Sequence, residues 1–292
     1  MKPALYPKRA LFHTDNIPHI DLLKDFQFII SNQNDTLRYM NTNIIDAHAH
    51  CGIQDRSMPQ TFEDYCSQIQ GSDIEAVVMF SPVMEIYDRY QPKFEDNAEW
   101  QQRRKISNEY LLTLGNSDLK VIPYFFIWND FAVNQLNFQH RGIKWHRHPN
   151  EPEYQYDNPR CKEAIDEIRR RNMPVVLEEE FENTIRFINE LAAGVKVIVP
   201  HLGLLNGGYA AFSRYEIWKN RNVFTDTALA PSYEIEDYIN KFGHDRILFG
   251  SDFPFGDPKE ELSKILNLSI PLENKKQILG LNLQRLLKNS NR

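Results

Sequence analysis

The sequence predicts an α/β protein folded as a (β/α)8 TIM barrel, with an N-terminal extension before it. Eight short apolar, β-branched segments recur between residues 43 and 252, and longer amphipathic stretches separate many of them. Parallel strands that are buried on both faces have this continuous apolar character, and eight such units close into a barrel. A doubly wound open sheet is the alternative, but its usual GxGxxG turn is absent.

The predicted strands are the apolar runs themselves, which span residues 43–50, 76–80, 121–128, 142–146, 174–178, 195–201, 223–227 and 246–252. Amphipathic spacing predicts helices over residues 97–114, 159–171, 181–193 and 232–242, and a final helix over 272–287 that closes the outer layer. Pro159 and Pro231 suit helix starts, whereas Gly194 and Gly243 lie where helices should stop.

Residues 1–42 precede the first strand and lie outside the repeating pattern, so we expect an N-terminal extension at 1–42 and the barrel at 43–292. Apolar residues on one side of 21–31 suit a short helix. We see no chemistry in the extension. We expect it to pack on the barrel or on a neighbouring subunit.

Composition excludes several classes of partner. The net charge of −6 is mild, there is no basic stripe, and the basic run at 169–171 suits an exposed helix end, so no nucleic-acid partner is expected. No apolar run is long enough to span a membrane, and three prolines interrupt the first 20 residues, so we expect neither a membrane partner nor a signal peptide. A small-molecule substrate is expected, and a homo-oligomer is left open.

The cysteines favour a reducing compartment. The chain has three, an odd number without a CxxC pair, at Cys51, Cys66 and Cys161. We expect free thiols and a cytoplasmic protein, with Cys51 a small buried thiol whose strand position points it away from the neighbouring histidines.

The most informative motif is Asp46-Ala47-His48-Ala49-His50 at the end of the first predicted strand. Strand side chains alternate between faces, so His48, His50 and Asp46 are predicted to share one face and the two alanines the other. Two imidazoles on one face can bind a divalent ion. An isolated His-x-His is more often a polar strand end, so the rest of the chain must supply further ligands.

Other strands also end in ligand-type residues. Lys144 and His146 share a face at the end of the fourth run, Glu178 ends the fifth, His201 ends the sixth and Asp252 ends the eighth. Each alone has an ordinary explanation, such as a loop histidine, a capping aspartate or a solvated lysine. Because barrel enzymes place their chemistry at the C-terminal ends of the strands, the coincidence predicts a metal site there.

These segments resemble the amidohydrolase superfamily, and specifically its amidohydrolase 2 branch. The resemblance rests on DAHAH at 46–50, GIKWH at 142–146, HLG at 201–203 and RILFGSDFP at 246–254, and it extends from about residue 43 to the C-terminus. It implies a barrel whose metal is held by His48, His50 and Asp252. It also implies that Asp252 serves as general base and that His201 binds a second metal or orients the water or substrate.

One position departs from that family. A histidine usually ends strand five, whereas this chain has Glu178. Glu178 is the candidate fourth ligand; the alternative is that residues 178–180 form the acidic first turn of the next helix. A second carboxylate ligand would shift the preference toward manganese or iron.

The number of metal ions is less constrained. Some superfamily members use a carboxylated strand-four lysine, here Lys144, to bridge two metals, but the Gly-Ile-Lys run also occurs in single-metal relatives. We expect one divalent ion, with zinc as first choice and manganese or iron as alternatives, and a binuclear site is left open.

The sequence therefore predicts a metal-dependent hydrolase that uses metal-activated water to cleave an amide, ester or lactone bond of a small molecule. Asp252 would take the proton and His201 would position or polarise the reacting group. A decarboxylase of a small aromatic acid is the alternative, and a non-catalytic barrel is a third class.

Substrate contacts are expected from Lys144, His146 and Trp145, with His148 and Trp128 as further candidates, although both tryptophans suit the outer-layer core equally well. Selectivity should lie in the loops at 54–60, 81–96 and 148–158, whose conformations do not follow from the sequence.

Overall fold

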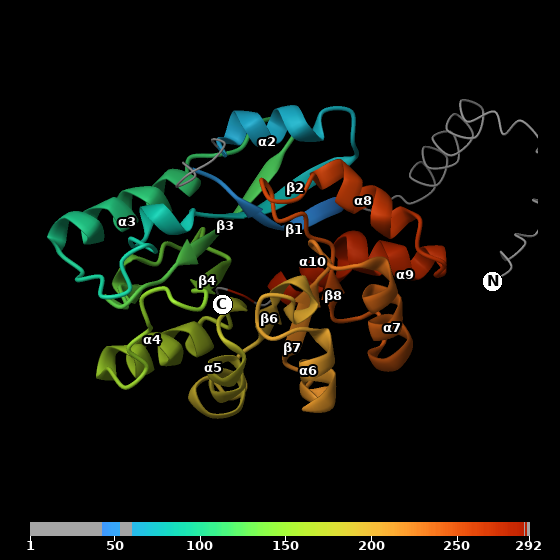
Figure 1. Cartoon of the computed structure of the whole chain (residues 1–292). Helices are drawn as coiled ribbons and strands as arrows, with labels where there is room; N and C mark the ends of the chain where they lie inside the picture. The colour runs from blue at the N-terminus through green and yellow to red at the C-terminus, as the bar shows by residue number, and fades with distance from the viewer. Residues whose placement is uncertain (1–42, 53–59, 289, 291–292) are drawn as a thin grey trace, which may run out of the picture. The chain divides into compact units, whose positions relative to one another are not determined.

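A computed structural model of the chain describes residues 43–52, 60–288 and 290 (Figure 1). The predicted N-terminal extension at 1–42, its helix at 21–31 and most of the loop at 54–60 lie outside the described residues. Within the described ranges, no helix has the length and apolar content needed to cross a membrane.

Eight parallel strands form one sheet in the order of the sequence, which confirms the predicted (β/α)8 barrel. Backbone hydrogen bonds from Ala47 N to Phe249 O (2.8 Å) and from His50 N to Phe253 O (2.9 Å) join the last strand to the first. The strands are β1 (Ile44–His50), β2 (Ile74–Phe80), β3 (Lys120–Phe126), β4 (Gly142–His146), β5 (Val175–Glu178), β6 (Val197–Val199), β7 (Val223–Asp226) and β8 (Ile247–Leu248).

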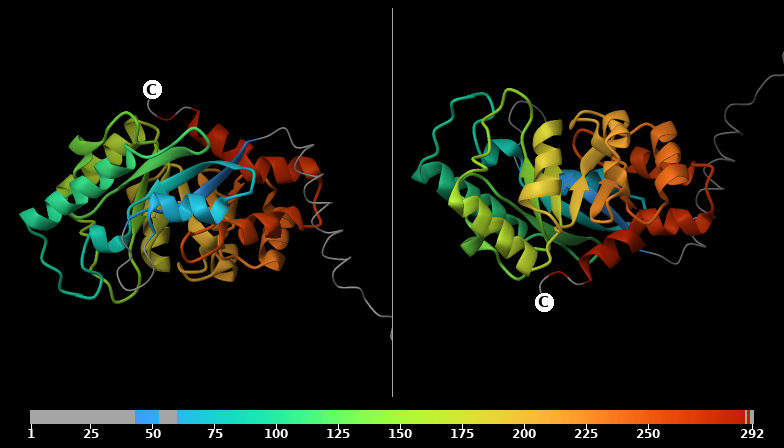
Figure 2. Two further views of the ribbon diagram at one scale, coloured as in Figure 1. Left: turned by 90° about the horizontal axis from the view of Figure 1, so that it is seen from above. Right: turned by 90° about the horizontal axis from the view of Figure 1, so that it is seen from below.

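Helices surround the strands as an outer layer (Figure 2). They are α2 (Phe62–Ile69), α3 (Ala98–Leu111), α4 (Pro159–Arg170), α5 (Phe181–Arg186), α6 (Tyr209–Arg214), α7 (Ser232–Phe242), α8 (Pro258–Leu266), α9 (Leu272–Lys276) and α10 (Asn282–Leu287). The predicted helix at 181–193 is α5 continued by a π-helical turn, and the one at 272–287 is interrupted by a π-helical turn between α9 and α10. Three helices, α2, α6 and α8, lie outside the predicted ones.

Local signals set several helix ends. Asn158 caps α4, its side chain accepting a hydrogen bond from the Arg160 amide, and Pro159 occupies the first turn, where a missing N–H costs nothing. Gly243 ends α7 with a positive φ of 85°, a conformation that favours glycine.

The core fills the interior of the barrel and extends toward the C-terminal helix. Its members are buried apolar residues of six strands together with α10: Ile45, Ala47, Ala76, Val78, Phe80, Ile122, Tyr124, Val176, Ile198, Leu248, Leu283, Leu286 and Leu287. These apolar layers leave the C-terminal ends of the strands for polar side chains.

The prediction that Asp46 shares a face with His48 and His50 is wrong, because β1 contains a bulge. The register of β1 against β2 shifts between Asp46 and Ala49, so simple alternation fails there. Ala47 packs in the interior cluster, whereas Asp46 accepts a hydrogen bond from the Tyr65 hydroxyl of α2 at 2.9 Å. Asp46 therefore does not share a face with His48, because one extra residue reverses the side-chain parity.

Two other strands are shorter than predicted, and the ligand-type residues that follow them lie at sharp turns. After β6, His201 has a φ of 57°, and after β8, Asp252 also has a φ of 57°. Gly250 precedes that second turn, and a Cβ there would lie 3.0 Å from the Cβ of His48. Close approach thus requires glycine at this point, and both side chains are aimed by turns instead of by strand pleating.

Candidate metal centre

A cavity of about 200 Å³ opens at the C-terminal ends of the strands. His50 and Asp252 line it from β1 and the chain after β8, and His146, His148 and Glu178 line it from β4, the chain after β4 and β5, across the barrel in the strand order. The remaining lining is mainly apolar: Pro82, Val83, Met84, Leu205, Leu229 and Phe255, with Gln60 and Arg89. The predicted position of the site, at the C-terminal end of the barrel, thus coincides with a hollow that contains titratable groups.

His48, His50 and Asp252 converge where β1 meets β8. The Nε2 atoms of His48 and His50 lie 3.3 Å and 3.2 Å from Asp252 Oδ1, and all three side chains are buried. One ligand atom from each lies within 4.8 Å of the others. Two imidazole nitrogens and a carboxylate oxygen, with space toward the cavity, form a donor set that fits a divalent ion.

Asp226, at the end of β7, orients the first histidine. His48 Nδ1 lies 2.8 Å from Asp226 Oδ2, and because an ionised carboxylate can only accept, Nδ1 carries the proton. Nε2 of His48 then carries the lone pair with which this residue would bind a cation. Asp226 is not among the predicted site residues, because the predicted strand 223–227 ends one residue later, at Thr227.

His201, just after β6, faces the carboxylate of Asp252. Its Nδ1 donates to the carbonyl oxygen of Ala228 (3.1 Å), which directs Nε2 toward Asp252 Oδ2 at 4.0 Å and Glu178 Oε2 at 3.9 Å. Burial alone would lower the pKa of His201, but the Asp252 charge and a hydrogen bond to Glu178 raise it to about 9. Without a metal, this histidine is therefore the cation that balances Asp252.

The pKa values of Asp252 and His50 are lowered, in contrast to that of His201. Burial would raise the pKa of Asp252, but the charge of His201 and the hydrogen bond from His50 lower it to about 2. Burial lowers the pKa of His50 to about 4. At neutral pH the centre therefore contains an ionised carboxylate and a neutral imidazole, which are the protonation states that a metal ligand requires.

Glu178 is the last residue of β5, and α5 begins only at Phe181, so its assignment to an acidic first helical turn is wrong. Its Oε2 lies 2.9 Å from Lys144 Nζ, and its Oε1 lies 2.7 Å from His148 Nε2. Burial opposes ionisation, but His146 and Lys144 hold the pKa of Glu178 well below its ordinary value. Glu178 groups with His146 and His148, so its role as a ligand beside His48 stays a prediction.

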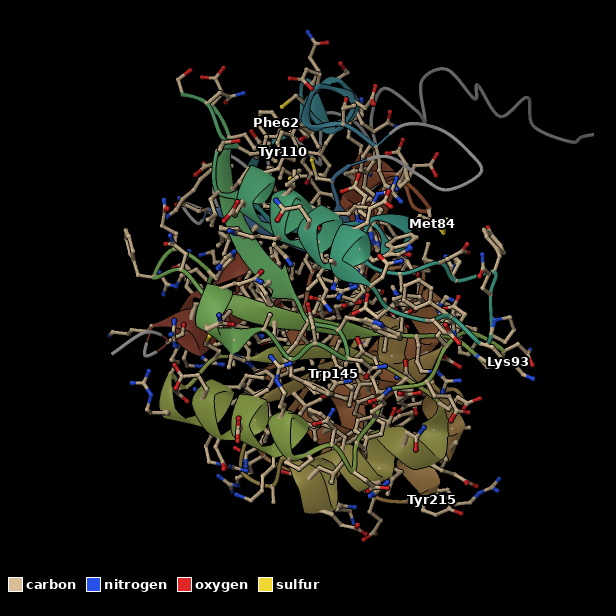
Figure 3. All side chains as sticks on the ribbon, turned by 90° about the vertical axis from the view of Figure 1, so that its left-hand side faces the viewer. Phe62, Met84, Lys93, Tyr110, Trp145 and Tyr215 are labelled. Atoms are coloured by element: carbon tan, nitrogen blue, oxygen red, sulfur yellow. The ribbon has the colours of Figure 1, made fainter. Side chains whose placement is uncertain are left out.

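Lys144 and Trp145 differ from the predicted substrate contacts. Lys144 is fully buried, with Nζ 3.5 Å from His48 Nε2, and it is not among the described residues that line the cavity. Trp145 is also fully buried and packs against Phe187 on the helix side of β4, between the strands and the outer helices (Figure 3). The expectation of a substrate contact for Trp145 is wrong, because alternation along β4 points it outward.

His146 does line the cavity, as predicted, and two loop residues that the sequence could not place support its rim. Arg89, after β2, donates from Nε to Glu151 Oε1 (2.7 Å) and from Nη2 to His148 Nδ1 (2.9 Å). Glu151, after β4, also accepts a hydrogen bond from the Tyr87 hydroxyl at 2.7 Å. These contacts tie two loops together beside the cavity.

Comparison with known proteins agrees with this architecture. The amidohydrolase family model matches residues 136–288, more than half of the chain, so the protein belongs to the amidohydrolase family, in its amidohydrolase 2 branch. That family consists of metal-dependent enzymes. No curated protein matches the chain.

Solved structures share the fold at low sequence identity. A 2,6-dihydroxybenzoate decarboxylase from Rhizobium is 15% identical, with a TM-score of 0.64 over 85% of this chain and 99% of that one. A 5-carboxyvanillate decarboxylase from Sphingomonas paucimobilis is 10% identical, with a TM-score of 0.62 over 86% and 100%. A protein from Pseudomonas putida described as a 2-pyrone-4,6-dicarboxylic acid hydrolase is 13% identical, with a TM-score of 0.58 over 85% and 98%.

Proposed function

We propose that the protein is a metal-dependent hydrolase that cleaves an amide, ester or lactone bond of a small molecule. The observation that carries this proposal is the convergence of His48, His50 and Asp252, of which His50 and Asp252 line the cavity. These three residues would hold one divalent ion, with zinc or manganese as the first to test. When bound, the ion supplies Lewis-acid chemistry, because it acidifies a water and polarises an oxygen of the substrate.

The chain itself supplies the proton transfers. The ionised Asp252 accepts a proton from the attacking water while the water oxygen bonds to the carbonyl carbon of the substrate. The bond to the amine or alkoxide then breaks, and Asp252 returns the proton to that leaving group. His201, whose Nε2 lies 4.0 Å from Asp252 Oδ2, orients the reacting group beside this carboxylate.

Asp226 is a positioning residue in this proposal. It fixes the tautomer of His48 from behind and also accepts a hydrogen bond from the His201 amide at 2.9 Å. The apolar walls of the cavity and the Arg89 guanidinium at its rim suit a compact substrate with an anionic group.

Decarboxylation is the second candidate, and one observation favours it. Arg89 and His148 both line the cavity and contact each other, so they could hold a carboxylate of the substrate there, and several proteins of similar fold are decarboxylases of aromatic acids. Such a reaction would use the same ion but release carbon dioxide in place of an acid and an alcohol or amine.

Product analysis separates the two candidates. Metal-loaded protein would be offered 2-pyrone-4,6-dicarboxylate and simple lactones, esters and amides, and in parallel 2,6-dihydroxybenzoate and 5-carboxyvanillate. Ring opening or acid release that Asp252→Asn abolishes supports hydrolysis. Carbon dioxide release alone would replace it by decarboxylation, and a wild-type protein that retains no metal would indicate a non-catalytic barrel.

A further inference from the structure

We propose a second divalent-cation site on the other side of the cavity, with His146, His148 and Glu178 as its ligands. The proposal deepens the proposed function, since both sites open into one cavity. It differs from what the family resemblance implies, in which His201 would bind a second metal. It also assigns a role to two histidines that the proposed hydrolysis does not use.

The three side chains converge because of how β4 and β5 pair. His146 is the register partner of Glu178, and the Arg147 amide donates to the Glu178 carbonyl oxygen at 2.9 Å, which continues the pairing past the end of β4. His146 and His148, two residues apart, therefore lie on one side of the chain, with ring centroids 4.6 Å apart. This repeats the plan of the first site, in which a His-x-His strand end meets a carboxylate from the neighbouring strand.

The distances suit a shared cation. His148 Nε2 lies 2.7 Å and His146 Nε2 lies 3.4 Å from Glu178 Oε1, and one ligand atom from each side chain lies within 4.8 Å of the others. All three residues line the cavity, so an ion there would keep an open position for water or substrate.

Internal hydrogen bonding does not account for His146. The residue is 3% exposed, its Nδ1 has no hydrogen-bond partner within the described part of the chain, and its Nε2 is farther from Glu178 than an ordinary hydrogen bond. Burying a polar ring with weak partners costs free energy, which a cation bound to the ring would offset.

His148 has a carboxylate behind it, as His48 does. Its Nδ1 lies 3.6 Å from Glu151 Oε1, which is beyond hydrogen-bond distance and farther than the 2.8 Å between His48 Nδ1 and Asp226 Oδ2. Binding through Nε2 requires the proton to be on Nδ1, where Glu151 can accept it only after the two groups move closer. Arg89 Nη2 now donates to that Nδ1, so Arg89 must turn away while its Nε keeps the bond to Glu151.

The second site should bind more weakly than the first. Lys144 Nζ lies 2.9 Å from Glu178 Oε2, so an internal ammonium in direct contact already balances the charge of this carboxylate, whereas the His201 Nε2 atom lies 4.0 Å from Asp252 Oδ2. An incoming cation meets two imidazoles and a nearly neutral ion pair, and it must also displace Arg89. We therefore expect one tightly held ion and one that exchanges readily.

Zinc titration of the full chain tests the site without an activity assay. Chelator-treated protein is equilibrated at rising free Zn²⁺ and its zinc content is measured. Wild type should take up two ions per chain in two steps. His148→Gln should lose the weaker step, with affinity lowered at least ~100-fold, because even the loss of an outer-shell partner of a metal ligand costs up to that much.

His244→Gln is the matched control, since the His244 side chain is 35% exposed and that of His148 is 29% exposed. It should leave both steps unchanged. Far-ultraviolet circular dichroism confirms that each variant is folded. His50→Gln should lose the tight step and keep the weak one.

Two results would overturn the second site: a wild type that saturates at one ion, or a His148→Gln variant that still binds two. Failure of the proposed function looks different, since wild type would then lack the tight step while the weak step remained measurable.

Discussion

Two strand pairs of this barrel each bring two histidines to a carboxylate, but the other charged groups around that carboxylate differ. At β1 and β8, the carboxylate of Asp252 faces three imidazoles, those of His48, His50 and His201. At β4 and β5, the carboxylate of Glu178 faces two imidazoles and the Lys144 ammonium. Each carboxylate has an internal cation, but Lys144 Nζ lies 2.9 Å from Glu178 Oε2 whereas His201 Nε2 lies 4.0 Å from Asp252 Oδ2. The comparison teaches that a count of donor atoms does not decide metal affinity, because an internal cation in direct contact can take the place of the external one.

Asp252→Asn should have the largest effect of any single change. The amide cannot accept the proton from water and is a poorer ligand, so we expect turnover to fall by about 10³-fold or more, together with loss of the tight ion. Steady-state kinetics on the substrate that wild type accepts and zinc analysis of the same samples measure both. Normal turnover in the variant would show that Asp252 takes no part in the reaction.

Glu178→Gln should instead reduce stability. It leaves the fully buried Lys144 ammonium without its carboxylate, which is expected to cost about 3 kcal/mol of unfolding free energy. Glu180→Gln is the matched control, because the Glu180 side chain is 42% exposed and its ion pair with Arg147 is worth well under ~1 kcal/mol. Urea unfolding of metal-free protein compares the two, and equal losses would contradict an internal ion pair at β4 and β5.

The pH dependence of metal-free protein should reveal the cation on the β1 and β8 side. The pKa of His201 is raised to about 9 in the folded protein from 6.5 in the unfolded chain, so its stabilising contribution is complete below pH 6.5 and is lost as pH rises through 9. We expect unfolding free energy to fall by about 2 to 3 kcal/mol across that interval. His201→Gln should flatten this part of the profile, and an unchanged slope would show that another group is responsible.

Asp226→Asn tests whether Asp226 positions His48, and its expected effect is smaller. It removes the acceptor that fixes the tautomer of His48, so affinity for the tight ion should fall about 10- to 100-fold with ligands intact. Competition with a chelator of known affinity measures the change. Glu151→Gln should leave this tight affinity as it is, and an equal loss in both variants would mean that the two sides are not separate.

Much of the barrel could be predicted because a continuously apolar run is typical of a parallel strand that is buried on both faces. The positions of His48, His50, His201 and Asp252 at strand ends followed from the same pattern. Asp226 ends the observed β7 but is the second-last residue of the predicted strand, so the same pattern does not single it out.

Other features depend on geometry that periodicity does not encode. The extra residue at the β1 bulge reverses the parity of Asp46, and left-handed backbone conformations at His201 and Asp252 set the directions of these side chains. Arg89 and Glu151 lie on loops, so only the three-dimensional structure brings them to the cavity. Alternation along β4 already places Trp145 on the helix side, opposite Lys144 and His146. The prediction that Trp145 contacts substrate did not take this into account.

The central claim is that the β1 and β8 side holds the tight ion. The most direct measurement is the metal content of protein purified without chelator and passed through gel filtration, for wild type, His50→Gln and His148→Gln. The account predicts about one divalent ion per chain in wild type and in His148→Gln, and almost none in His50→Gln. A His50→Gln variant that keeps its ion, or a His148→Gln variant that loses it, would contradict the account.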